Sequence, residues 1–96
     1  MRIDQKIVIC GGHDTFLKAL KGFLKGNVKY IDRERNFQIA TLNNASEIWI
    51  QLNAISHPQY YRVTNYAKAN GIPVRFFKHA SAKKCADQVF ESLKQG

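Results

Sequence analysis

Short apolar runs alternate along this chain with segments in which apolar residues return every three or four positions. A short apolar run bounded by Gly, Pro or Asn is typical of a buried strand, whereas the wider spacing is typical of a helix with one apolar face. The runs predict strands at 6–10, 28–31, 47–55 and 73–77. The spaced segments predict helices at 14–25, at 58–70 and from 82 onward, with a short helix at 37–42 and a charged turn at 32–36.

The ends of the predicted helices carry their own signals. Asp14 or Thr15 can cap the first helix, and Gly26 stands where Gly commonly ends a helix. Ser56 and Ser81 can cap the two later helices. We expect the apolar face of the first helix to pack in the core, with Phe16, Leu17, Leu20, Phe23 and Leu24.

Alternating strands and helices predict a parallel sheet with helices on both faces. Right-handed crossovers favour the strand order 2-1-3-4. We therefore expect one Rossmann-like, flavodoxin-like three-layer α/β domain across residues 1–96. In such sheets, ligands bind beyond the carboxyl ends of the strands where the strand order reverses. That rule places the predicted crevice beyond the first and third strands.

Polar residues and glycines follow those two strands directly. Gly11, Gly12 and His13 come after the first strand, and Ser56 and His57 come after the third. Glycine lets the backbone turn sharply and approach a ligand, and a helix N-terminus directs amide donors and partial positive charge at the same place. We therefore predict that Gly11, Gly12 and His13 cradle an anion, with Ser56 and His57 facing it. The alternative is a plain tight turn followed by an ordinary helix start.

Enzymatic chemistry is the second interpretation of the same residues. His13 and His57 can serve as an acid/base pair or as metal ligands acting on a phosphoester. A metal site needs three or four ligands, and neither Cys stands at a usable spacing, so we predict no metal and no cofactor. Cys10 precedes the glycine turn, but that loop is too short for a phosphatase and lacks its later Arg. The turn also matches neither the dinucleotide nor the P-loop pattern, which argues against an ordinary nucleotide site of either kind. We predict no catalytic residue.

The charge balance indicates a polyanionic partner. The chain has 15 Lys and Arg residues against 7 Asp and Glu residues, a formal net charge of +8 at pH 7. Together with the predicted anion site, this charge favours non-catalytic binding of a nucleotide or nucleic acid. Either Tyr60 or Tyr61 should face the core, which leaves the other free to stack on a base. The expected basic surface comprises Lys18, Lys21, Lys25, Arg75, Lys78, His79, Lys83 and Lys84, and the alternative is a solvated lysine face.

Size and cysteine usage set the remaining expectations. Cys10 and Cys85 are too few for a disulfide framework, so we expect two buried, reduced thiols. Without a long apolar segment or a signal-peptide pattern, we expect a cytoplasmic protein that does not enter a membrane. A chain of this length buries only about 60–65% of its unfolded surface, and a homodimer would bury more. A third interpretation is accordingly a protein-interaction or regulatory module that works as a homo-oligomer.

Four segments together resemble a known protein family. They are Ile7-Val8-Ile9-Cys10-Gly11-Gly12-His13, Ile55-Ser56-His57, Tyr61-Arg62-Val63 and Gly71-Ile72-Pro73-Val74. In order and spacing they resemble the small bacterial proteins, classed as a domain of unknown function, that pair a Gly-Gly-(His/Arg) turn with a later Ser-His. The resemblance implies a Rossmann-like domain in the bacterial cytoplasm and no established activity. Trp49 and Gln51 depart from the family pattern, which implies a different local pocket.

Overall fold

Parallel strands form the centre of the computed structural model, which describes residues 2–31 and 38–95. Within these ranges four strands lie in the order β2-β1-β3-β4, which confirms the predicted sheet. The strands are β1 (Arg2–Cys10), β2 (Lys25–Ile31), β3 (Glu47–Ile50) and β4 (Val74–Phe76). The helices are α1 (Asp14–Phe23), α2 (His57–Asn70) and α3 (Ala82–Gln95), with short 3-10 turns η1 (Ile39–Leu42) and η2 (Leu52–Ala54). The predicted turn at 32–36 and Phe37 lie outside the described residues.

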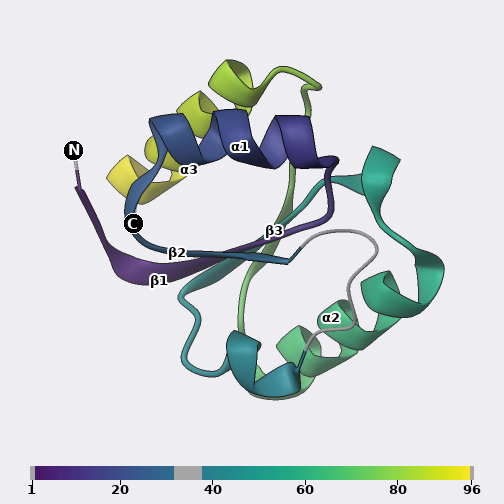
Figure 1. The fold of residues 1–96 in the computed structure, drawn as a ribbon. Coiled ribbons are helices and arrows are strands. Elements are labelled where there is room, and N and C mark those ends of the chain that lie inside the picture. The colour runs from purple at the N-terminus through teal and green to yellow at the C-terminus, as the bar shows by residue number, and fades with distance from the viewer. Residues whose placement is uncertain (1, 32–37, 96) are drawn as a thin grey trace.

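Helices cover both faces of the sheet, as the alternating pattern predicts. Figure 1 shows α1 and α3 together on one side, with α2 and η1 on the other. Successive strand residues point to opposite faces. Ile7, Ile9 and Trp49 therefore pack toward α1 and α3, whereas Val8 and Ile48 pack toward α2. Burial on both faces explains why the runs in β1 and β3 are apolar almost throughout.

The first helix is shorter than predicted. It ends at Phe23, and the prediction that it reaches residue 25 is wrong. Lys25 and Gly26 instead begin β2, where they pair with Arg2 and Ile3 at the start of β1. Gly26 has a φ of 120°, which an L side chain rarely adopts. Gly26, which the sequence predicts as a helix end, therefore allows the backbones of β1 and β2 to approach closely. Both strands also begin earlier than predicted.

Most of the predicted apolar face of α1 is confirmed. Leu17, Leu20 and Leu24 are buried, and Phe16 is half-buried. Phe23 is 45% exposed, which corrects the expectation that it lies in the core. The chain leaves the helix at Leu24, so Leu24 takes the last core position and Phe23 is left at the surface.

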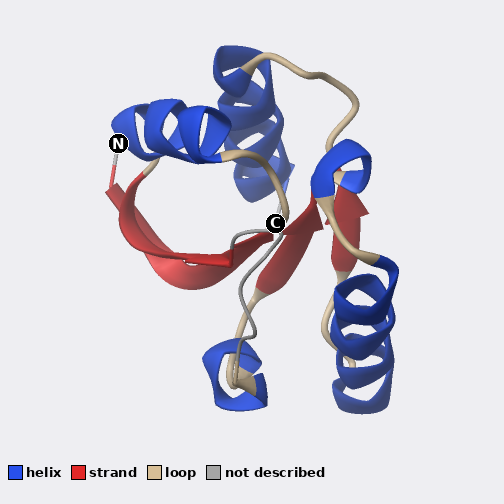
Figure 2. Cartoon of the chain, turned by 45° about the vertical axis from the view of Figure 1, so that its right-hand side comes forward, coloured by secondary structure: helices blue, strands red, loops and turns tan. Residues whose placement is uncertain are grey.

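The third strand also ends earlier than predicted, at Ile50 rather than residue 55. The chain bends here because it meets the glycine turn after β1. The Gln51 amide donates to the Cys10 carbonyl at 2.9 Å, and the Gly12 amide donates to the Ala54 carbonyl at 2.7 Å. The Gln51 bond is the last of the ladder between β1 and β3, in which Cys10 pairs with Ile50, whereas the Gly12 bond belongs to the turn around η2. In Figure 2 the chain turns through a short helical piece between the end of the central strands and α2.

The predicted caps of the two later helices are confirmed. The Ser56 Oγ accepts a hydrogen bond from the Gln59 amide at 3.2 Å, and Gly71 ends α2 in the left-handed region with φ 67°. The Ser81 Oγ accepts from the Lys84 amide at 3.5 Å, a long bond. The expected cap of α1 is wrong: His13 stands at the N-cap, and its side chain makes no capping bond.

Candidate functional site

The carboxyl ends of β1, β3 and β4 surround a small open pocket at the edge that sequence reasoning selected. Its volume is about 120 Å³. His13 and Gly12 contribute from the turn after β1, and Ala80 contributes from the loop after β4. The whole lining consists of Gly12, His13, Phe16, Gln51, Asn53, Ala54 and Ala80.

Gly12 lines this pocket and Gly11 precedes it, but the amides of both glycines are already occupied. The Gly11 amide donates to the Ile31 carbonyl at 2.8 Å, and the Gly12 amide donates to Ala54. A Cβ atom on Gly11 would lie 2.8 Å from the Ala54 carbonyl oxygen. The backbone of the glycine turn, which the sequence predicts to approach a ligand closely, thus lies against the protein's own segment 51–54. An anion bound in this pocket would therefore need hydrogen-bond donors other than these two amides.

The N-terminus of α1 offers such donors. His13 precedes the helix in an extended conformation, and the first helical bond runs from the Leu17 amide to the His13 carbonyl at 2.9 Å. The amides of residues 14–16 come before that bond, so they have no acceptor within the helix. The partial positive charge of the helix is concentrated at the same end, although the exposed Asp14 carboxylate opposes it.

The N-terminus of α2 is a poorer anion site. Ser56 already accepts the Gln59 amide, and Pro58 has no amide to offer. Ser56 and His57 are both exposed and lie outside the lining of the pocket. The structure therefore does not bring Ser56 and His57 into the pocket with His13.

The loop after β4 takes the place expected for the start of α2. The His79 carbonyl accepts from the Gln51 Nε2 at 3.1 Å and from the Cys85 Sγ at 3.2 Å, which holds Ala80 at the pocket. The sequence predicts Lys78 and His79 of this loop only as part of the basic surface, marks Gln51 only as a departure from the family pattern, and gives no prediction for Asn53. The signal for Gln51 and Asn53 is present, because both interrupt the apolar run at 47–55 with amide side chains.

Neither metal nor thiol chemistry finds support in the described parts of the chain. Residues 2–31 and 38–95 contain no group of three or more His, Cys, Asp and Glu side chains placed to hold a metal ion. Cys10 and Cys85 are free and buried, as predicted. Burial raises the pKa of Cys10 to about 12 and that of Cys85 to about 11. A thiol with such a pKa is a poor nucleophile near neutral pH.

Both thiols should therefore react slowly with a disulfide reagent in the native protein. Relative to an ordinary thiol of pKa 9.0, a pKa of about 12 lowers the thiolate fraction of Cys10 about a thousandfold at neutral pH. The release of the reagent's chromophore, followed in the native state and in denaturant, measures the difference. Rapid labelling of one Cys in the native state would contradict the burial described here.

The predicted basic surface on the helices is partly balanced by acidic groups. Lys18, Lys21, Lys83 and Lys84 are exposed on α1 and α3, which lie on the same side of the sheet. Lys83 lies 3.6 Å from the Asp87 carboxylate, and Asp14 and Glu91 are carried by the same two helices. Lys25 belongs to β2 instead of α1. The surface formed by α1 and α3 is therefore less positive, and less suited to binding a long nucleic-acid backbone, than its number of lysines indicates.

The other members of that surface stand near β4. Arg75 donates through Nε to the Glu47 carboxylate at 2.9 Å, so part of its charge is neutralised. Lys78 and His79 have exposed side chains beyond the strand, close in sequence to the pocket residue Ala80. Of the residues in the predicted basic surface, these two are the nearest in sequence to Ala80.

The two tyrosines at the start of α2 divide as predicted. Tyr60 packs against the core beneath α2, and Tyr61 is 60% exposed. Their rings meet edge to face with centroids 5.4 Å apart. Tyr61 is therefore available at the surface, although it belongs to α2 and does not line the small pocket.

Comparison with known proteins adds no relative. No family model, no curated protein and no solved structure matches this chain. The resemblance to the Gly-Gly-(His/Arg) family therefore stays a prediction from the residues. Among the described residues, no helix combines the length and the apolar character needed to cross a bilayer.

Proposed function

We propose that this protein binds a phosphate-bearing ligand, a nucleotide or a nucleic acid, without catalysing a reaction on it. One observation carries the proposal: α1 begins without a side-chain cap beside a pocket at the carboxyl ends of β1, β3 and β4. Free amides and the positive end of a helix together favour a bound anion. His13, at the N-cap and in the pocket lining, stands next to that anion.

The pocket suits one phosphate group better than a whole nucleotide. Small-molecule pockets typically measure about 300–1,000 Å³, and this one measures about 120 Å³. The phosphate would therefore sit at the helix end while the rest of the ligand lies over the surface. The net charge of +8 favours the encounter, whereas Asp14 weakens the contact. Binding should accordingly be modest and sensitive to salt.

The same geometry gives less support to an enzyme. His57 lies outside the pocket that His13 lines, so a two-histidine acid/base pair has no shared site. The thiol of Cys10 is buried with a raised pKa. The homo-oligomeric interaction module is a separate alternative, which a measurement of the protein's mass in solution tests.

The substitution His13→Asp tests the proposal because it separates stability from binding. An Asp at the N-cap should accept the free amides of α1 and stabilise the fold by about 0.5–1 kcal/mol. The same carboxylate should repel a phosphate and weaken binding of ATP or of a short single-stranded RNA at least about tenfold. Amide chemical shifts, followed during titration at about 50 mM and about 300 mM NaCl, report both the place and the salt dependence of binding.

The matched control is His57→Ala, which removes an exposed histidine outside the pocket. It should leave the affinity for both probes unchanged. Unaltered binding by the His13→Asp protein, or shifts that avoid residues 12–16, would overturn the proposed site. Comparison of ATP with RNA decides between a nucleotide and a nucleic acid as the better ligand.

A further inference from the structure

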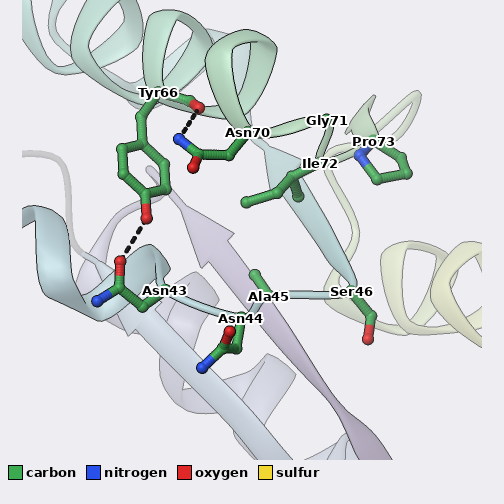
Figure 3. Close-up of a pocket in the computed structure, with 9 residues that line it drawn as sticks. All are labelled: Asn43, Asn44, Ala45, Ser46, Tyr66, Asn70, Gly71, Ile72 and Pro73. Atoms are coloured by element: carbon green, nitrogen blue, oxygen red, sulfur yellow. Dashed lines mark hydrogen bonds between the residues drawn. The ribbon is translucent and has the colours of Figure 1, made fainter.

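A second and larger pocket lies at the opposite end of the sheet, where β3 and β4 begin and α2 ends. Its volume is about 550 Å³, within the range of small-molecule sites. It is lined by residues 43–46, residues 70–73 and Tyr66. Figure 3 shows the segment 43–46 along one side and Tyr66 with the end of α2 along the other. None of these residues takes part in the anion site.

The lining of this polar pocket is uncharged. Its hydrogen-bonding side chains are Asn43, Asn44, Ser46, Tyr66 and Asn70, with no Asp, Glu, Lys, Arg or His among the lining residues. An amide or a hydroxyl side chain can both donate and accept hydrogen bonds. A phosphate can only accept, and an ammonium group can only donate, so neither matches this set well. A ligand hydroxyl, which also does both, matches it.

Two internal hydrogen bonds hold part of the lining in place. The Tyr66 hydroxyl donates to the Asn43 Oδ1, and the Asn70 Nδ2 donates to the Tyr66 carbonyl at 2.8 Å (Figure 3). Asn43 keeps its amide nitrogen as a donor, and Asn70 keeps its side-chain oxygen as an acceptor. The Lys6 ammonium nearby is engaged by the Asn43 carbonyl at 2.8 Å. These residues form a preset frame with both kinds of group to spare.

Two further side chains are unused. Asn44 and Ser46 are exposed, and within the described ranges neither side chain makes a hydrogen bond. Asn44 has a φ of 62°, in the left-handed region. The end of α2 borders the same pocket, and its last carbonyls give that end a partial negative charge that disfavours a bound anion. The pocket therefore combines neutral hydrogen-bond donors and acceptors with a tyrosine ring and with the negative end of α2.

From this combination we infer that the pocket binds an uncharged polyhydroxyl small molecule, either a ring sugar or an open-chain polyol. The hydroxyls bond to Asn44, Ser46 and Asn70, and the ring of Tyr66 offers an apolar surface beside them. The pocket is open, so the affinity of a single small ligand should be in the millimolar range.

Titration of the protein with glucose, ribose and sorbitol, followed by amide chemical shifts, tests this inference. We expect saturable shifts in residues 43–46 and 70–73 and in the side-chain amides of Asn44 and Asn70. Glucose and ribose against sorbitol distinguish a ring sugar from an open-chain polyol. Glucose 6-phosphate should bind this pocket no more tightly than glucose, because no lining residue is a cation and the nearby Lys6 ammonium is already engaged by the Asn43 carbonyl.

Two substitutions remove ligand contacts without removing any hydrogen bond within the described protein. Asn44→Gly suits the positive φ at that position, and Ser46→Ala deletes a hydroxyl that has no described partner. Each should weaken sugar binding about three- to tenfold while the midpoint of thermal unfolding stays constant or rises. Asn65→Ala, on an exposed part of α2 outside the pocket, is the matched control and should bind as the wild type does.

The inference is overturned if none of the neutral probes shifts the pocket amides at tens of millimolar. It is equally overturned if Asn44→Gly and Ser46→Ala together leave binding unchanged, or if glucose 6-phosphate binds there more tightly than glucose. None of these results depends on the anion site at α1.

Discussion

Replacing Gly26 with Ala should destabilise the protein by about 3 kcal/mol or more, the largest effect expected of a single methyl group in this chain. Gly26 pairs with Ile3 across β1 and β2 at a φ of 120°. A Cβ there would lie 2.2 Å from the Ile3 carbonyl oxygen and 2.6 Å from its nitrogen. Both atoms are backbone, so the strands themselves must separate. The free energy of unfolding, measured by urea denaturation, reports the loss.

Two other glycines make a matched series. Gly71 also has a positive φ of 67°, but in the described part of the chain no atom beyond its two chain neighbours lies within 4 Å of a Cβ built there. Gly71→Ala should therefore cost only about 1 kcal/mol, the price of the left-handed conformation alone. Gly22 lies inside α1 with open space around it, and Gly22→Ala should stabilise the protein by about 0.5 kcal/mol. Equal losses at Gly26 and Gly71 would show that the backbone angle, and not the strand contact, sets the cost.

Replacing Glu47 with Ala should cost about 2–4 kcal/mol, because it removes a buried charged acceptor shared by three donors. The Glu47 carboxylate accepts from the Trp49 Nε1 at 3.1 Å, the Arg75 Nε at 2.9 Å and the Ser92 Oγ at 2.7 Å. These bonds connect β3 to β4 and to α3 on the face that α1 and α3 cover. Without Glu47, the indole N–H of Trp49 stays buried and loses its partner.

Substitutions of the residues that bond to Glu47 show how much each hydrogen bond contributes to stability. The Arg75 side chain is 49% exposed, so Arg75→Ala should cost no more than about 1 kcal/mol. Ser92→Ala should cost about 1 kcal/mol, since one charge-assisted hydrogen bond is lost while two remain. The same denaturation experiment measures all three variants. A loss in Arg75→Ala as large as that in Glu47→Ala would mean that the ion pair dominates and that the buried N–H matters little.

Much of the fold follows from local patterns in the sequence. Apolar runs alternating with helical spacing predict the α/β class, and right-handed crossovers predict the strand order 2-1-3-4, both of which the structure confirms. Ser56 predicts the start of α2 correctly, because capping depends on the residue and its nearest neighbours. Local signals of this kind need no knowledge of the rest of the chain.

The candidate site is less accessible from the sequence. Chain position points to the carboxyl edge of the sheet, where the structure has a pocket lined by His13, yet His57 lies outside that pocket and Ala80 lines it. The sequence predicts that the Gly11 and Gly12 amides bind an anion, but in the structure they donate to the carbonyls of Ile31 and Ala54, which are distant in the sequence. Which loop closes over the turn depends on how the strands and their connections pack, and no short segment encodes that.

The sequence by itself thus determines the class of the fold, the layers, the strand order and the edge at which a site is expected, because these depend on periodicity and chain order. Only the tertiary structure decides where β3 stops, what Gly26 does and which groups remain free to bind. Gly26 illustrates the reason: its neighbours in the sequence resemble a helix end, whereas its role depends on the backbone of Ile3 in the adjacent strand. Hydrogen bonds and steric contacts between distant segments settle such choices.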